Sequence, residues 1–564
     1  MLQAITRLAI VAPRRVIAVA VLIMVGAAIF GIPVAKNLSA GGVHAPSSES
    51  WEAARLLSGK FGQGDMQLLI AVTSDAGITG PAARAVGTDL VEHLQASPYV
   101  AVVNSVWNAS PTAAPALISK DGKTGLIIAG ITGDESGAQK HAKALVDQLA
   151  RDRDGVTVRA SGEAIIYVQA NEQSQQDLLL MESIAIPLSF LVLVWVFGGL
   201  LAAAVPLAVG CFAILGSMAV LRAVTLVTDV SVFALNLTAA MGLALAIDYT
   251  LLIISRFRDE LAEGAGREEA LLRTMAAAGR TVLFSAMTVA LSMVAMVLFP
   301  MYFLKSFAYA GIAVVALAAT AAIVVAPAAL VLIGERLNSF DVRRMVRRAR
   351  GRTGPRPAAS PDDRVLPSSA AARQIADQAR TGFAGNPTTN VTIVIPDMTG
   401  VNSAELGRYA GQLSRVPDVS SVSAPGGTFV SGALGGPPSA PTAIKDGSAF
   451  FTVGSTAPLF SSASDSQLER LHAVAGPAGQ RALMTGIAQI SRDSAEGITS
   501  RLPLVLGLIA SITFVLLFLL TGSVVLPLKA LLLNILSLSA AFGALVWIFQ
   551  DGHLGAFGTT PTGT

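Results

Sequence analysis

Long apolar runs alternate with two long polar stretches along this chain of 564 residues. A bilayer core about 30 Å thick requires roughly 20 apolar residues for one helical crossing. The runs that approach or reach this length lie at about residues 16–34, 183–197, 200–221, 233–254, 281–298, 307–333, 502–520 and 524–549. The second is long enough if it begins near Leu178. The pattern predicts a polytopic α-helical membrane protein.

The first polar stretch has the alternating character of a folded soluble domain. Strands are predicted at residues 68–74, 99–106, 124–131 and 155–160, and helices at residues 80–96 and 137–150. Their order along the chain, β-α-β-β-α-β, is typical of a compact α+β domain of the ferredoxin-like kind. We therefore expect such a domain between the first and second spans.

The second polar stretch repeats features of the first. Pro46–Phe61 resembles Pro367–Phe383, and each is followed by a predicted strand. Gly162-x-Ala164 likewise matches Gly486-x-Ala488, and each pair precedes a Pro-Leu pair that opens a span. The common order of these matches indicates an internal duplication, which is frequent in transporters.

These patterns divide the chain into seven parts. They are an N-terminal segment with the first span (1–35), a first α+β domain (36–177), five spans (178–334), an Arg-rich linker (335–361), a second α+β domain (362–500), two spans (501–549) and a tail (550–564).

Composition supports a membrane protein and excludes several other classes. Hydrophobic residues make up 53% and charged residues 14% of the chain, against about 25% charged residues in ordinary globular domains. The net charge of +3 gives no general attraction to nucleic acid. Cys211 is the only cysteine and the five histidines are scattered, so no metal site is expected. No phosphate-binding glycine loop and no nucleophile-base constellation stands out, so neither an ATP-driven pump nor an enzyme is favoured.

Arginine clusters give the orientation. They precede the first span, fill the gap between the fourth and fifth spans, and follow the sixth span, and strict alternation places all three on the cytoplasmic side. Residues 36–177 are then outside. Strict alternation would place residues 362–500 inside, whereas the duplication predicts them outside, so their orientation stays open. Arg267–Arg280 is predicted as a separate amphipathic helix at the interface, and Asp341–Arg352 as an anchor that attracts anionic lipids.

Asp248 is the residue most informative about function, because it interrupts the apolar run from Phe233 to Ile254. A charge at the centre of a membrane helix costs roughly 2.5–3.5 kcal/mol on insertion scales, so such residues usually face a bundle interior and have a function there. A carboxylate can take up and release a proton, and the neighbouring Tyr249 can exchange hydrogen bonds with it. Packing alone remains the alternative role, more so for Tyr249 than for Asp248.

The segments GLALAIDYTLLIISRFRDELAEG, GRTVLFSA, FLKS and TGSVVLPLKALLLN resemble the mycobacterial membrane protein large (MmpL) family, which belongs to the resistance-nodulation-division (RND) superfamily of proton-driven exporters. The resemblance implies an inner-membrane protein of actinobacteria with soluble domains facing the periplasm, which exports lipids or other hydrophobic molecules. It requires no cofactor beyond the proton gradient. The substrate and the oligomeric state stay open, as do cell-envelope partners.

The resemblance also implies a proton relay at Asp248 and Tyr249, with Ser285 of the FSA motif close to them. Ser285 could equally serve only as a hydrogen-bonding group between helices. Two family features are missing. Only residues 353–366 stand where a seventh span is expected, and a second Asp-Tyr pair on a tenth span would come after Thr564.

Three hypotheses follow. The first is an exporter driven by the proton-motive force. The second is a non-transporting remnant or partner-binding scaffold in the membrane, which the two missing features favour. The third, less favoured because the chain has two similar soluble domains, is an accessory protein of protein export from the same superfamily.

Overall fold

The computed structural model describes residues 2–39, 41–111, 113–333, 371–382 and 387–553. Eight helices within these ranges are long and apolar enough to cross a membrane. The expected polytopic membrane protein with α+β soluble domains is therefore confirmed. The Arg-rich linker (335–361), including Asp341–Arg352, lies outside the described residues, as does the tail beyond residue 553.

The chain forms two compact units. One comprises Met1–Gly42, Gln173–Ala358 and Ser500–Ser537, and holds most of the membrane helices. The other comprises Val43–Glu172, Ala359–Thr499 and Leu538–Thr564, and holds the two α+β domains. Two long helices, α6 (Glu163–Phe197) and α14 (Ile487–Thr521), begin in the second unit and end in the first.

Among the described residues, six further α-helices belong wholly to the membrane unit, and a seventh, α15, begins in it. They are α1 (Leu2–Val11), α2 (Pro13–Gly31), α7 (Leu200–Val224), α8 (Phe233–Ala262), α9 (Arg267–Val294), α10 (Tyr302–Ile333) and α15 (Val525–Leu545). Short 3₁₀ helices follow α2 and α9 at Ile32–Asn37 and Ala295–Leu298.

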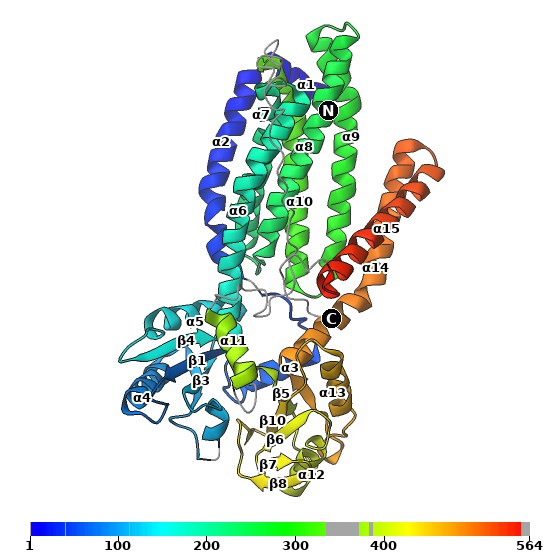
Figure 1. Cartoon of the computed structure of the whole chain (residues 1–564). Coiled ribbons are helices and arrows are strands. Elements are labelled where there is room, and N and C mark those ends of the chain that lie inside the picture. Colours follow the sequence, from blue (N-terminus) through cyan, green and yellow to red (C-terminus); the bar gives the residue numbers. More distant parts are fainter. Residues whose placement is uncertain (1, 40, 112, 334–370, 383–386, 554–564) are drawn as a thin grey trace. The chain divides into compact units, whose positions relative to one another are not determined.

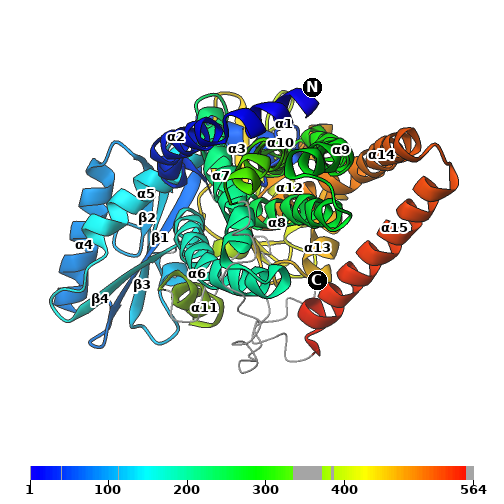
Figure 2. The ribbon, with the colours of Figure 1, turned by 90° about the horizontal axis from the view of Figure 1, so that it is seen from above.

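Helix α10 is the most buried helix of the membrane unit. Of its most apolar window, 61% is buried inside the protein, against 6% for α14. Helices α7, α8, α9 and α10 share one apolar core, and Figure 2 shows α7, α8 and α9 grouped around α10. Many buried residues of α10 are alanines, among them Ala308, Ala318 and Ala322. Small residues allow membrane helices to approach closely and gain dispersion contacts.

The expected separate interfacial helix at Arg267–Arg280 is wrong. These residues form the first half of α9, which continues without a break to Val294. The reason is that the buried stripe of Leu271, Met275 and Ala278 runs on into the apolar half at Val282. Gly279 lies inside this continuous helix, with the Met275 side chain beside it.

The first α+β domain has the predicted order of elements. Its elements are β1 (Met66–Ser74), α4 (Pro81–Ala96), β2 (Val100–Ser105), β3 (Thr124–Ile131), α5 (Glu135–Leu149) and β4 (Val156–Ser161). The strands form an antiparallel sheet in the order β2-β3-β1-β4. This is the ferredoxin-like arrangement expected from the sequence.

The second α+β domain repeats this arrangement. Its elements are β5 (Val391–Ile395), α12 (Ser403–Leu413), β6 (Val419–Ala424), β7 (Gly427–Val430), β8 (Ala433–Gly436), β9 (Ala443–Lys445), β10 (Ser448–Ser455), α13 (Ser462–His472) and β11 (Leu483–Thr485). The order β11-β5-β10-β6 matches the first sheet, and β7 and β8 extend it beyond β6, while β9 pairs with β10. The internal duplication is thus visible in the fold.

Each sheet is covered on its second face by a helix from the other half of the chain. Helix α11 (Ala371–Gly382) places Ile375 against Leu69 and Ala71 of β1 in the first domain. In return, α3 (Glu49–Gly59) places Ala53 and Leu57 in an apolar cluster of the second domain. This exchange explains why β1 is apolar at consecutive positions, since both of its faces are buried.

Polar contacts hold the N-terminal end of α3 on the second domain. The Glu49 carboxylate accepts the Met484 backbone N–H at 2.7 Å and contacts the His472 ring Nε2 at 3.2 Å. The Asp493 carboxylate accepts the Ser50 N–H at 2.9 Å. The hydrogen bond with Glu49 raises the pKa of His472 against the opposing effect of burial. Burial alone would raise the pKa of Glu49, but the hydrogen bonds from His472 and Met484 outweigh it and lower the pKa.

Candidate functional site

Helix α8 carries the two residues of the predicted proton relay. It runs unbroken over Phe233–Ala262, because its sequence is rich in Ala and Leu, which favour helices, and contains no proline. The hydroxyls of Thr238 and Thr250 donate to the carbonyls four residues earlier, at Ala234 and Ala246. These bonds satisfy polar side chains inside the helix, where no water is at hand. The backbone of α8 is therefore a regular support for Asp248 and Tyr249.

Tyr249 lies in the core of the membrane unit. Its side chain is 4% exposed and belongs to the apolar cluster shared by α7–α10. Its hydroxyl lies close to the Ser285 hydroxyl of α9 and within electrostatic reach of Asp248. Among the described residues it has no hydrogen-bond partner of standard geometry. A buried hydroxyl without a partner is costly, so the Tyr249 hydroxyl is available for a bond that forms in another state or through water.

Asp248 and Ser285 lie on the surface of the bundle. Both are exposed in the structure, whereas the intervening Tyr249 is buried. The structure thus brings Tyr249 and Ser285 together from adjacent helices, with Asp248 next to them on α8. A carboxylate, a phenol and an alcohol in this order can each exchange protons or hydrogen bonds with the next.

Sequence reasoning missed one buried carboxylate, Glu260, near the end of α8. Its side chain is 5% exposed and lies 2.7 Å from Arg256 and 3.8 Å from Arg273 of α9. In the sequence it is one of several charges in SRFRDELAEG, which is typical of a solvated helix end. The spacing of Arg256 and Glu260, four residues apart on a helix, was the available signal.

A second carboxylate that sequence reasoning did not single out is Glu182 of α6. It is partly buried and lies within electrostatic reach of Cys211 on α7. Its position five residues before Pro187, just inside an apolar run, was the signal for it. Within the described ranges, no three His, Cys, Asp or Glu side chains are arranged to hold a metal ion.

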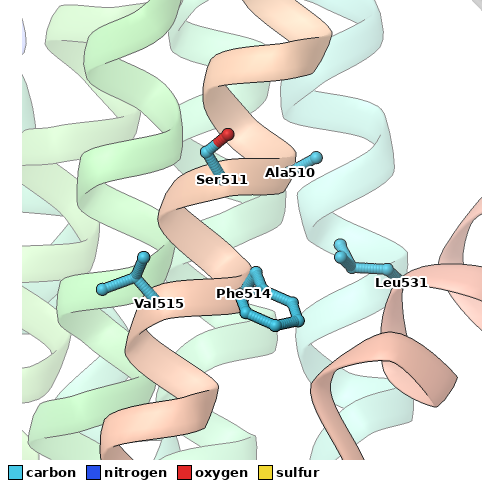
Figure 3. A pocket seen from close by; sticks show the side chains of 5 residues that line it. All are labelled: Ala510, Ser511, Phe514, Val515 and Leu531. Carbon is cyan, nitrogen blue, oxygen red and sulfur yellow. The ribbon is translucent and has the colours of Figure 1, made fainter. Parts of the chain in front are cut away.

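An open groove of about 360 Å³ lies between α14 and α15. Figure 3 shows its lining, in which Phe514 of α14 approaches Leu531 of α15. The other lining residues are Ala510, Ser511 and Val515, and the Ser511 hydroxyl donates to the Gly507 carbonyl of its own helix. No group in this lining titrates, so the groove contributes nothing to a proton relay.

A family model described as the MMPL family matches residues 43–362 and 364–560. A putative membrane protein of Streptomyces coelicolor, SCO6666, is 33% identical over 90% of this chain and 72% of its own length. The family resemblance expected from the sequence is thereby confirmed.

Two further relatives have names that state a function. The trehalose monomycolate exporter MmpL3 of Mycobacterium tuberculosis is 29% identical over 97% of this chain. The mycolic acid-containing lipids exporter MmpL11 of Mycolicibacterium smegmatis is 27% identical over 95% of it. The chain spans 64% of the length of MmpL3 and 59% of that of MmpL11.

The alignment with MmpL3 also bears on the expected missing span. It runs over 624 positions, whereas this chain has 564 residues, so at least 60 of its positions have no residue here. MmpL3 therefore carries residues within the matched region that have no counterpart in this chain. The absence of the seventh span in particular stays a prediction.

Proposed function

Because this chain belongs to the MMPL family, we propose that it is a secondary transporter, not an enzyme, which exports lipids or other amphipathic envelope molecules. Transport would cross the inner membrane and be driven by the proton-motive force. The observation that carries the proposal is the buried Tyr249 hydroxyl, which lies beside Ser285 and next to Asp248 without a hydrogen-bond partner among the described residues. The lipid exporters among the relatives support the substrate class.

In this proposal, the proton-carrying group is the Asp248 carboxylate. Protonation removes a charge whose presence inside a membrane is costly, so the two states of Asp248 favour different surroundings. In another state or through water, the Tyr249 hydroxyl would donate a hydrogen bond to the charged carboxylate, which becomes a weaker acceptor when it is protonated. Ser285 supplies the next hydroxyl on α9. Uptake and release of one proton thus changes which hydrogen bonds connect α8 to α9.

The two α+β domains supply the conduit in this proposal. They would face the periplasm and receive the substrate from the outer leaflet of the inner membrane. The helices α3 and α11, each docked on the sheet of the other domain, hold the two domains together. Attraction of anionic lipids by the Arg-rich segment at residues 335–361 belongs to the same proposal.

The decisive experiment uses the full-length protein in proteoliposomes with trehalose-containing and other amphipathic lipids and an imposed pH gradient. Asp248→Asn keeps the shape of the side chain but cannot ionise, so gradient-driven export should fall by about 100-fold or more. Asp259→Asn is the matched control, because Asp259 is an exposed aspartate on the same helix. Export by Asp248→Asn at the rate of the unmodified protein would refute the proton role.

Tyr249→Phe separates function from packing. The change removes only a buried hydroxyl that has no hydrogen-bond partner of standard geometry among the described residues, so the folded protein should be no less stable in detergent than the unmodified one. Proton-coupled export should nevertheless fall. If the unmodified protein moves no lipid and no protons, while remaining folded and inserted, the scaffold alternative holds instead.

A further inference from the structure

The α8–α9 elbow, defined as residues 256–275, contains a buried charge that the proton relay does not use. Helices α8 and α9 run side by side and are joined by the turn between Ala262 and Arg267 (Figure 1). Glu260 is buried there, while its partners Arg256 and Arg273 are 44% and 54% exposed. Arg273 also pairs with Glu269, four residues earlier on α9.

The two arginines differ in what they can connect. Arg256 lies on α8, one turn before Glu260, so this pair lies within a single helix. Arg273 lies on α9, so its ion pair with Glu260 joins the two helices. A carboxylate removed from water requires such partners, because an unpaired buried charge is far more costly than an unpaired charge at the surface. Sliding of α9 along α8 would remove one of them.

The ion pair and the relay share one helix register. Asp248 lies twelve residues before Glu260 on α8, and Ser285 lies twelve residues after Arg273 on α9. Both helices rise about 1.5 Å per residue, so an offset set at the elbow is carried about 18 Å to the relay. Counted from the turn, Arg273 lies about one helical turn farther away than Glu260, and Ser285 lies slightly more than one turn farther away than Tyr249.

The directions of the side chains fit this offset. Helical side chains tilt toward the N-terminus of their own helix. On α9 this direction takes the Arg273 side chain toward the elbow, where it meets Glu260. On α8 it takes the Tyr249 side chain away from the elbow, where it meets Ser285. Each contact therefore requires the same displacement of one helix relative to the other.

Packing of α9 alone fixes its axial position only in part. Its buried residues include the large Leu271, Met275 and Val282 but also the small Ala270, Ala278, Gly279 and Ala286. Such small residues permit close approach of helices but present shallow ridges, which fix an axial position less firmly than large interlocking side chains do. The charged pair at the elbow adds a contact that is specific for one axial position.

We propose that Glu260 is a positioning residue: its ion pair with Arg273 fixes the register of α8 against α9 and thereby places Ser285 opposite Tyr249. The consequence for transport rests on the proposed function, whereas the consequence for register does not. The ion pairs of Glu260 are with Arg256 and Arg273, and its effect on the relay would act through Arg273.

Cross-linking tests the register without requiring transport. In the full chain, Cys211→Ala removes the only native thiol, and Tyr249→Cys with Ser285→Cys reports whether the two positions face each other. A short bifunctional thiol reagent should link them rapidly. Adding Glu260→Gln should slow the linkage severalfold, while Glu268→Gln, at an exposed position in the first turn of α9, should leave it unchanged. An unchanged rate with Glu260→Gln in a folded protein overturns the proposal.

A second pair of variants covers the case in which Glu260→Gln fails to fold. Arg273→Gln removes the link between the helices, and Arg256→Gln removes only the link within α8. Linkage should slow with Arg273→Gln, remain near normal with Arg256→Gln, and be restored by Arg273→Lys, which keeps the charge. Equal effects of the two glutamine variants would assign Glu260 a merely structural role and refute the proposal.

Transport measured on the same single variants, with Tyr249 and Ser285 intact, separates this proposal from the proposed function. Misplacement by about 1 Å can reduce a positioned reaction by 100-fold, so Glu260→Gln should reduce proton-coupled export while leaving membrane insertion normal. If Asp248→Asn exports normally but Glu260→Gln still alters cross-linking, the proton role fails and the register role stands. If Glu260→Gln alters export but not cross-linking, the register role fails.

Discussion

The two α+β domains have the same sheet order but differ in how each receives its exchanged helix. Helix α3 is attached to the second domain through an ionisable pair, Glu49 with His472. Several contacts of α11 on the first domain join neutral groups, such as the Ser161 hydroxyl with the Ala372 carbonyl at 3.0 Å. Charged contacts respond to pH and salt, while neutral ones do not. Duplication thus preserved the topology and left the two attachments free to diverge.

Both helices are attached through apolar contacts, each in its own cluster. Removing such a contact should destabilise the attachment more than any other change. Phe450 is 2% exposed, packs edge-on against Phe61 at 4.9 Å between ring centroids, and lies in the cluster that receives α3. Phe450→Ala should cost about 3–5 kcal/mol and release α3. Leu69→Ala should release α11 at a cost of about 2–5 kcal/mol. Hydrogen–deuterium exchange of α3 and α11 would distinguish the two.

The exchange would be disproved if each substitution increased amide exchange only in the helix from its own half of the chain. Leu434→Ala offers a matched control, because Leu434 lies on the extension strand β8 and is 61% exposed. It should leave amide exchange in both helices unchanged.

The second effect should be a pH dependence of the α3 attachment, through His472 and Glu49. Because the pKa of His472 is raised, its contribution to the stability of the docked α3 is complete below the unfolded pKa of 6.5. That contribution is lost as the pH rises through the folded pKa. Because the pKa of Glu49 is lowered, its contribution to the stability of the docked α3 is complete above the unfolded pKa of 4.5. That contribution is lost as the pH falls through the folded pKa. Attachment of α3 should therefore be strongest between pH 4.5 and 6.5.

His472→Gln provides the check for this window. At pH 6 it should weaken the protection of α3 amides against hydrogen exchange by about 1–2 kcal/mol. Above pH 6.5 the protection should no longer decrease further as the pH rises. Protection of α11 should be the same at each pH in both proteins. A pH profile of α3 that survives the substitution would assign the effect to another group.

The smallest effect should come from a neutral contact of α11. The Gln378 side-chain amide donates to the Thr124 hydroxyl at 2.9 Å. Thr124 keeps a second partner, the Thr73 hydroxyl at 2.9 Å, when that donor is removed. Gln378→Ala should therefore weaken protection of α11 by only about 0.5–1 kcal/mol, equally at pH 5 and pH 8. A clear difference between the two pH values would contradict the contrast between the attachments.

Periodicity predicted most elements of the first domain, and β3 lies where it was expected at Thr124–Ile131. The continuous apolar run of β1 shows that both faces are buried, but it cannot show what covers the second face. That helix, α11, lies about 300 residues further along the chain. Exchange between repeats is invisible to a local pattern, because α3 and α11 have similar sequences and either could serve either sheet.

The candidate site shows a similar limit. Asp248 could be identified from the sequence, because an acidic residue in an apolar helix is costly and is usually retained for a function. The resemblance then brought in Ser285, which the structure places beside Tyr249. Glu260 gave no such signal, since a glutamate among arginines at a helix end is ordinary at a surface. Only its burial, set by the antiparallel packing of α9, distinguishes it. The proton role of Asp248, Tyr249 and Ser285 stays a prediction.

The exchange of α3 and α11 also has a consequence for synthesis at the ribosome. Helix α3 ends at Gly59, whereas β11, on which it docks, begins at Leu483. At about 5–20 residues per second, the chain waits roughly 20–85 seconds between making the helix and making its binding surface. During this time Leu57 and its apolar neighbours have no native partner. Helix α3 therefore stays undocked until the second domain has been made, and a factor that shields its apolar side during elongation would increase the yield of folded protein.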